Sequence, residues 1–142
     1  MGNGNEYNPS GGFSTYLYET VGQPVTINGY KCKIVQMKTD KGKNGYHAGL
    51  PAFANTSDIY VGLGPQNKPR QMRLYVNRKQ VVDFDWGHAH QNSDGKKFVK
   101  GTVHVQRYFG AKGGDARYMS NSEIKKYGAI IKYFCPEVKL RP

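Results

Sequence analysis

Three histidines in one polar stretch are the residues of this sequence best suited to chemistry. Residues 83–109, DFDWGHAHQNSDGKKFVKGTVHVQRYF, include His88, His90 and His104. An imidazole titrates near neutral pH, so it can accept a proton in one step and return it in the next. The three side chains are therefore candidates for a general acid–base set.

The chemistry that such a set favours is cleavage of a phosphodiester bond of RNA without a metal ion. One imidazole would remove the proton of a 2′-hydroxyl, and another would protonate the leaving oxygen. A cation, for which Arg107 is the candidate, would stabilise the charge of the transition state, and Tyr108 completes the catalytic candidates. The residues that we expect to bind the substrate are His47, Lys96, Lys97 and Lys100.

Two other interpretations of the histidines stay open. The same imidazoles could ligate zinc and leave one position for water, which would make the protein a metal-dependent nuclease. They could also line a solvent-exposed face of the sheet without a chemical role. The protein would then be a non-enzymatic nucleic-acid-binding protein or a phage-encoded inhibitor. We expect no metal and no cofactor. Asp83 and Asp85 should point away from the histidines and so cannot orient them, and the surrounding lysines repel a dication.

Strand alternation is what must bring the histidines together. The apolar and polar pattern predicts four strands, each antiparallel to the next, at residues 58–63, 72–76, 80–90 and 101–109. Phe84, Trp86, His88 and His90 should then share one face of the third strand, with Trp86 in the core. One register across the SDGKK turn adds His104 to that face, and a one-residue slip would remove it.

The rest of the chain predicts an α+β fold. Asn28-Gly29 is typical of a type I′ turn, so residues 25–35 should form a hairpin. Ser120 and Glu123 form a capping box, which predicts a helix over residues 121–134. We expect an antiparallel sheet of four to six strands with this C-terminal helix packed on one face.

Length, composition and charge indicate one basic domain at residues 13–142, preceded by a flexible polar segment at residues 1–12. Residues 1–30 contain two acids and no Lys or Arg, so the net charge of +11 comes from the rest of the chain. Such a charge attracts polyanions, so nucleic acid is the expected partner and an acidic protein the next.

Cysteine content and hydropathy bear on the compartment. Cys32 and Cys135 lack metal-type spacing, and we expect two reduced, buried thiols. No apolar run reaches the length of a membrane span, and the N-terminus does not look like a signal peptide. We therefore expect the protein to act in the cytoplasm, of a target cell if it is a delivered toxin, and to have no membrane partner.

Three runs of the sequence resemble a family of toxins. The runs NTSDIYVGLGPQNKPRQMRLYVNRKQVVDFDWGHAHQN, GTVHVQRY and ARYMSNSEIKKYG are similar to C-terminal effector domains of bacterial polymorphic toxins and phage-borne proteins. The likeness is to the barnase–EndoU–colicin–RelE group of ribonucleases, in element order and in a basic sheet that carries histidines. The resemblance implies metal-free RNA cleavage and an acidic immunity protein as partner. The N-terminal helices usual in the group have no match here.

Overall fold

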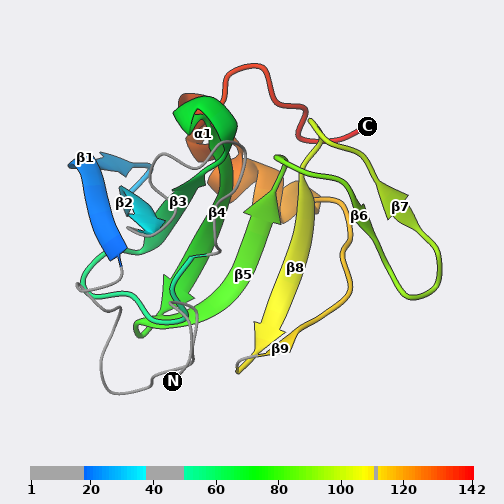
Figure 1. Cartoon of the computed structure of the whole chain (residues 1–142), viewed down its shortest axis with the longest axis horizontal. Helices are drawn as coiled ribbons and strands as arrows, with labels where there is room; N and C mark the ends of the chain where they lie inside the picture. The colour runs from blue at the N-terminus through cyan, green and yellow to red at the C-terminus, as the bar shows by residue number, and fades with distance from the viewer. Residues whose placement is uncertain (1–17, 38–49, 111) are drawn as a thin grey trace.

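The computed structural model describes residues 18–37, 50–110 and 112–142. The expected flexible segment 1–12 and the candidate His47 lie outside these residues. The main sheet has seven strands in the order β1-β2-β3-β4-β5-β8-β9, and β6 and β7 form a separate pair (Figure 1). The strands are β1 (Tyr18–Ile27), β2 (Tyr30–Met37), β3 (Ile59–Leu63), β4 (Pro69–Val76), β5 (Lys79–Asp85), β6 (His90–Gln91), β7 (Lys97–Phe98), β8 (His104–Phe109) and β9 (Lys112–Gly113). The helices are the 3-10 helix η2 (Pro65–Asn67) and α1 (Asn121–Phe134).

The predicted α+β class, with its antiparallel meander and C-terminal helix, is confirmed. Strands β3, β4, β5 and β8 are each antiparallel to the next. The β1–β2 hairpin joins the four meander strands through a parallel pairing of β2 with β3, and the short strand β9, paired with β8, adds a seventh strand beyond the expected four to six. The hairpin turns at Asn28 and Gly29, whose φ angles of 52° and 83° both lie in the left-handed region, as a type I′ turn requires.

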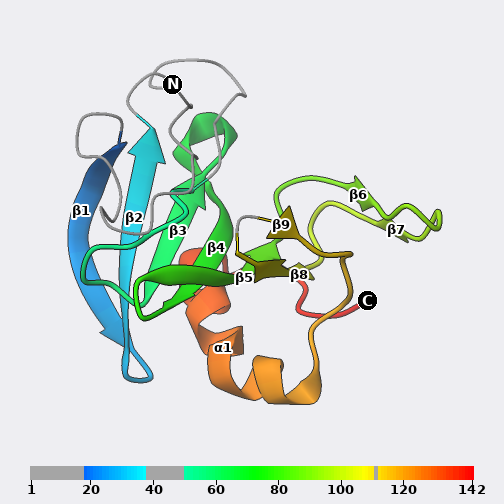
Figure 2. The same ribbon diagram turned by 90° about the horizontal axis from the view of Figure 1, so that it is seen from below.

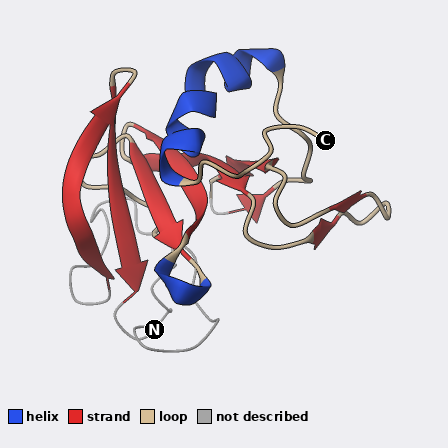
Figure 3. Cartoon of the chain, turned by 90° about the horizontal axis from the view of Figure 1, so that it is seen from above, coloured by secondary structure: helices blue, strands red, loops and turns tan. Residues whose placement is uncertain are grey.

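One face of the sheet is apolar, and α1 covers it (Figures 2 and 3). Phe84 of β5 meets the helix, where its ring centroid lies 5.2 Å from that of Tyr127. The remaining core side chains come from both layers: Ile59, Val61, Met72, Leu74, Val82, Val105, Ile130 and Ile131 are all buried. The helix begins as predicted, because Ser120 and Glu123 form the capping box. Both cysteines are buried free thiols.

The C-terminal tail packs against the strand that carries His104. The backbone of Lys139 exchanges hydrogen bonds with Gly101 and Val103, just before β8 begins. Leu140 lies over Gly128 of α1, where an added Cβ atom would come within 2.9 Å of the Leu140 side chain. The tail thus holds the start of β8 in place. Among the described helices, none has the length and apolar character needed to cross a bilayer.

Candidate functional site

The third predicted strand ends earlier than expected, and this changes how the histidines are positioned. We predicted one strand over residues 80–90, but β5 stops at Asp85 and the chain bends before β6. The Asp85 carboxylate accepts a hydrogen bond from the Gly87 N–H at 3.1 Å, which is an Asx turn. Gly87 also passes so close to β4 that a Cβ atom there would lie 2.2 Å from the Cβ of Arg70. The alternation from Phe84 to His90 is therefore broken.

His90 is held by the small β6–β7 hairpin, which projects from the sheet (Figure 2). Its main-chain partner in the hairpin is Phe98, which is buried. The hairpin is tied to the body by Asn92, whose side-chain amide both accepts from and donates to the backbone of Ala116, each bond 2.8 Å long. The neighbouring residue, Arg117, pairs with Val105 of β8. His90 thereby comes to rest beside His104.

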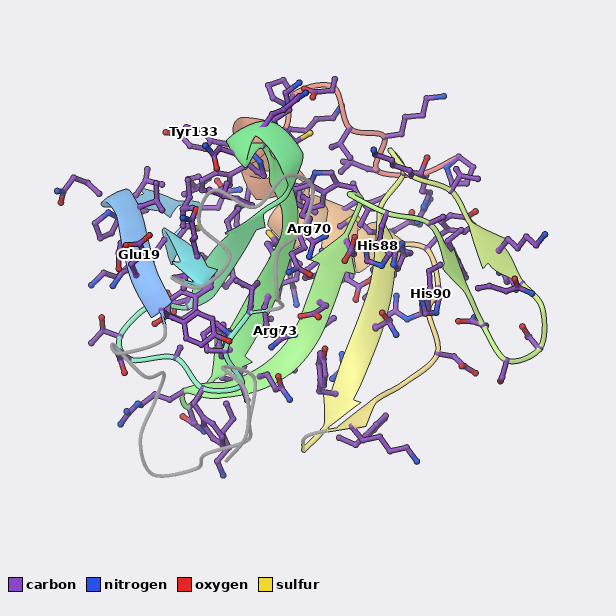
Figure 4. The ribbon with its side chains drawn as sticks, viewed as in Figure 1. Glu19, Arg70, Arg73, His88, His90 and Tyr133 are labelled. Atoms are coloured by element: carbon purple, nitrogen blue, oxygen red, sulfur yellow. The ribbon has the colours of Figure 1, made fainter. Side chains whose placement is uncertain are left out.

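The three histidines do come together. Each offers one ring nitrogen, and these nitrogens lie within 4.8 Å of one another. The His104 ring centroid is 5.5 Å from that of His88 and 5.3 Å from that of His90, the latter pair being stacked. His88 and His90 lie beside β8, near the base of the β6–β7 hairpin (Figure 4). We call His88, His90 and His104 the histidine cluster.

The histidine cluster runs from the surface into the interior. The side chain of His88 is 48% exposed, His90 is half-buried and His104 is 0% exposed. Neither Nδ1 nor Nε2 of His104 has a hydrogen-bond partner among the described residues. Buried polar atoms are nearly always paired, so this imidazole is exceptional. Burial lowers the pKa of His104 below its ordinary value, against the opposing charge of Asp85.

Asp85 supports the cluster, contrary to the sequence-based expectation. We expected Asp83 and Asp85 to point away from the histidines, but Asp85 stands opposite His104 in the β5–β8 pairing, and so on the same face. Its Oδ1 atom lies 3.1 Å from Nδ1 of His88, and this hydrogen bond raises the pKa of His88. Asp83 pairs with Gln106 and also shares this face. The expectation was wrong on two counts: the register of β5 and β8 puts His104 on the face of Asp85 and not on that of Phe84, and the bend after Asp85 then returns His88 to the Asp85 side.

His90 has an equivalent support in Asn92. Its Nε2 atom lies 3.1 Å from Oδ1 of Asn92. The Ala116 backbone determines the orientation of the Asn92 amide, because that amide receives the Ala116 N–H and donates to the Ala116 carbonyl. Oδ1 is therefore an acceptor, and His90 must donate through Nε2.

The structure does not bring Arg107 and Tyr108 to the cluster. Arg107 is three residues beyond His104 on β8 and so lies on the opposite face, toward Tyr127 of α1. Burial raises the pKa of Tyr127 to about 12, and the charge of Arg107 only partly opposes this rise. Tyr108 shares the face of His104, but its hydroxyl contacts Arg73 and Asp83, each at 2.9 Å. Burial and the Asp83 carboxylate raise the pKa of Tyr108 to about 12.

Arg73 is the centre of a second buried polar group on this face. Its guanidinium forms a bidentate pair with Asp83, with N–O distances of 2.5 and 2.9 Å, and also donates to Gln80 and to the carbonyls of Leu50 and Pro51. Burial opposes its charge, and Asp83 more than compensates by raising the pKa. These contacts join the segment before β3 to the sheet, which is a structural role.

The three lysine candidates occupy different places around the cluster. The Lys96 ammonium lies over the rings of Phe98 and Tyr118, 5.5 Å from each centroid. Lys97 is exposed on β7. Lys100 lines a groove with a volume of about 310 Å³, which also has Lys68, Arg70 and Glu137 at its polar edge. The groove is also lined by Trp86 and Gly87, the two residues that precede His88 in the chain.

Sequence reasoning missed several residues that shape this site. Ala116 and Arg70 lie far from the histidines in the sequence. Asn92 is only two residues from His90, but the Ala116 backbone orients its amide. No local pattern reveals that long-range contact. The position of Arg107 was accessible, because residues three apart on a strand face opposite sides.

No protein-family model, curated protein or solved structure matches this chain.

Proposed function

We propose that this protein cleaves nucleic acid, with RNA as the favoured substrate, and that the histidine cluster is its reaction centre. The observation that carries the proposal is the convergence of three imidazoles beside a groove with cationic edges. The net charge of +11 draws a polyanion to such a surface. Imidazoles supply either the proton transfers or the metal ligands that phosphodiester cleavage uses.

The groove next to His88 is suited to one unit of a nucleic-acid strand. Its volume of about 310 Å³ is at the small end of ligand sites, about 300–1,000 Å³. Lys68, Arg70 and Lys100 present positive charge to phosphates, against the single carboxylate of Glu137. Arg70 is close enough to His88 to lower its pKa, although the bond to Asp85 dominates. A phosphate bound in this groove beside Arg70 would therefore lie near the histidine cluster.

Two mechanisms can operate at this cluster. In a metal-free reaction, His88 with its raised pKa would donate a proton and His104 with its lowered pKa would accept one. An acid or base must touch the substrate, however, and His104 is completely buried. Burial argues against this role and leaves a metal-activated water as the mechanism that the geometry supports better.

The resemblance to toxin domains adds a partner to this proposal. An acidic immunity protein would be attracted to the basic residues that line the groove and would block a strand from it. Lys100 lines the groove and His88 directly follows the lining residue Gly87, and both are exposed. Loss of toxicity on binding would follow from occlusion alone, without a change in the enzyme.

The test compares cleavage by the purified full chain with that of matched variants. Total RNA and single-stranded DNA are incubated with the wild type, with His88→Ala, and with Lys126→Gln on the exposed side of α1. We expect RNA to be degraded by the wild type and by Lys126→Gln, and to survive with His88→Ala. Binding without cleavage by all three proteins would refute the proposal and favour a non-enzymatic nucleic-acid-binding protein. Bacteria that express the wild type should grow less than those expressing His88→Ala.

A further inference from the structure

We infer that His88, His90 and His104 bind one Zn²⁺ ion, through Nε2 of His88, Nδ1 of His90 and one ring nitrogen of His104. The catalytic use of this metal rests on the proposed function, whereas its binding does not. The site is open on the side of His88, which leaves a coordination position for water or substrate.

The first argument is the unpaired imidazole in the interior. His104 is completely buried, and neither of its nitrogens has a hydrogen-bond partner among the described residues. A buried polar group without a partner costs about 1–3 kcal/mol, so a fold seldom keeps one without a purpose. A metal ion would bind one nitrogen of His104 directly.

The second argument is the tautomer that each neighbour imposes. At neutral pH a carboxylate accepts hydrogen bonds and donates none. His88 therefore donates to Asp85 through Nδ1–H, and Nε2 of His88 carries the free lone pair. The Asn92 amide is oriented by Ala116, so His90 donates through Nε2–H and its Nδ1 carries the free lone pair. Each neutral ring therefore has one nitrogen ready to ligate.

These neighbours are also the supports that metal ligands usually have. A histidine that binds a metal almost always donates its other N–H to a carboxylate or carbonyl oxygen, which determines the ring's orientation and raises its basicity. Asp85 does this for His88, and the Asn92 side chain does it for His90. Asn92 is itself buried and bonded at both amide atoms, so the support is rigid.

The distances require only a local adjustment. Zinc–nitrogen bonds of about 2.0–2.1 Å in a tetrahedron place the ligand nitrogens about 3.3 Å apart. One ring nitrogen from each histidine lies within 4.8 Å of those from the other two. Closing the widest gap by about 1.5 Å lies within the reach of a side-chain rotation, and His88 is exposed enough to make it.

Ligand chemistry favours zinc over Mg²⁺ and Ca²⁺, and the local charge permits a dication. Three imidazoles suit zinc, as they suit copper, nickel and iron, whereas Mg²⁺ and Ca²⁺ prefer oxygen ligands. Lys96 and Lys97 are exposed to solvent, so water and salt screen their positive charge. Asp85 is 6% exposed and places a negative charge beside His88 and opposite His104. The expected repulsion of a dication is thereby offset.

The test is a zinc titration of the full chain after removal of metal with a chelator. Competition with a chromophoric chelator gives affinity, and elemental analysis after desalting gives the stoichiometry. We expect about one zinc per chain in the wild type, and no binding of Mg²⁺ at the same concentration. Asp85→Asn should weaken zinc binding about 10–100-fold, whereas Asp94→Asn, in the exposed hairpin turn, should leave it unchanged. His88→Leu and His104→Leu should weaken it more than Asp85→Asn.

The outcomes separate this inference from the proposed function. Wild-type protein that binds no zinc, or that binds it as tightly as His88→Leu does, would overturn the metal site. Stoichiometric zinc in a protein that degrades no nucleic acid would support the site and refute the nuclease. Cleavage that continues at the full rate in metal-stripped protein would support the nuclease and overturn the catalytic use of the metal. Circular dichroism of each variant shows that it is folded.

Discussion

The effect of His104→Leu on stability should depend on zinc. The variant should be more stable than the wild type in chelator and should lose this advantage when zinc is added. Leucine is close to histidine in volume but has no polar atom to leave unpaired. In chelator, the substitution removes a buried imidazole whose two nitrogens lack hydrogen-bond partners. A buried side chain with unpaired polar atoms lowers the stability of the fold by about 1–3 kcal/mol. We therefore expect His104→Leu to be more stable than the wild type by about 1–3 kcal/mol. For a domain of this length, that raises the unfolding midpoint by about 3–12 °C.

Zinc should restore the advantage of the wild type. A ligand that binds only the folded state at 100 times its Kd stabilises that state by about 2.7 kcal/mol. His104→Leu lacks a ligand and should gain little. His88→Leu is the matched control: it also loses a ligand, but His88 is 48% exposed and its removal relieves no burial penalty. In chelator, His88→Leu should therefore not exceed the wild type.

The assay is thermal unfolding followed by far-UV circular dichroism, in chelator and in excess zinc. A midpoint for His104→Leu below that of the wild type in chelator would show that the His104 nitrogens are satisfied after all. An equal rise of the wild-type and His104→Leu midpoints with zinc would show that the metal binds elsewhere. Either result would refute the reasoning.

Three other predictions concern tautomers, a buried ion pair and a helix cap. In metal-free protein at neutral pH, nitrogen-detected NMR should find the neutral form of His88 protonated at Nδ1 and that of His90 protonated at Nε2; the opposite tautomers would contradict the hydrogen bonds to Asp85 and Asn92. Asp83→Leu should cost about 3–5 kcal/mol in urea unfolding, because it leaves the Arg73 charge buried without its partner; a loss below about 1 kcal/mol would contradict this. Burial opposes the charge of the Glu123 carboxylate, but its bonds to Arg117 and Ser120 outweigh burial and lower the pKa below 4.5. The stability that this ionisation gives is present above pH 4.5 and is lost as the pH falls through the lower pKa of the folded state. Glu123→Gln should therefore be less stable than the wild type at neutral pH, and this difference in stability should shrink in acid.

The local elements of the fold could be predicted because their causes are local. The Asn28-Gly29 turn and the Ser120–Glu123 capping box each depend on residues a few positions apart, and both form as expected. The grouping of the three histidines was expected for only one register of a continuous strand, and neither that strand nor that register forms, since Asp85 and not Phe84 shares the face of His104. Gly87 and the Asx turn at Asp85 end that strand, and the packing of Arg70 that excludes a Cβ is a long-range contact.

The supports of the site could not be read from the sequence for the same reason. Asn92 orients His90 only because Ala116, from a distant segment, pairs with both of its amide atoms. Alternation along a strand wrongly turned Asp85 away from the histidines, and that error removed the argument for a metal. Arg107 is different, since its odd spacing from His104 already indicated the opposite face.

The most direct test of the central claim is an anomalous diffraction map, recorded at the zinc edge from crystals of the full chain grown with zinc. We predict one strong peak among the three imidazoles, about 2.0–2.1 Å from Nε2 of His88, Nδ1 of His90 and a ring nitrogen of His104. Data recorded below the edge should lack this peak. An empty histidine cluster in crystals with zinc bound elsewhere, or with no zinc at all, would contradict the account.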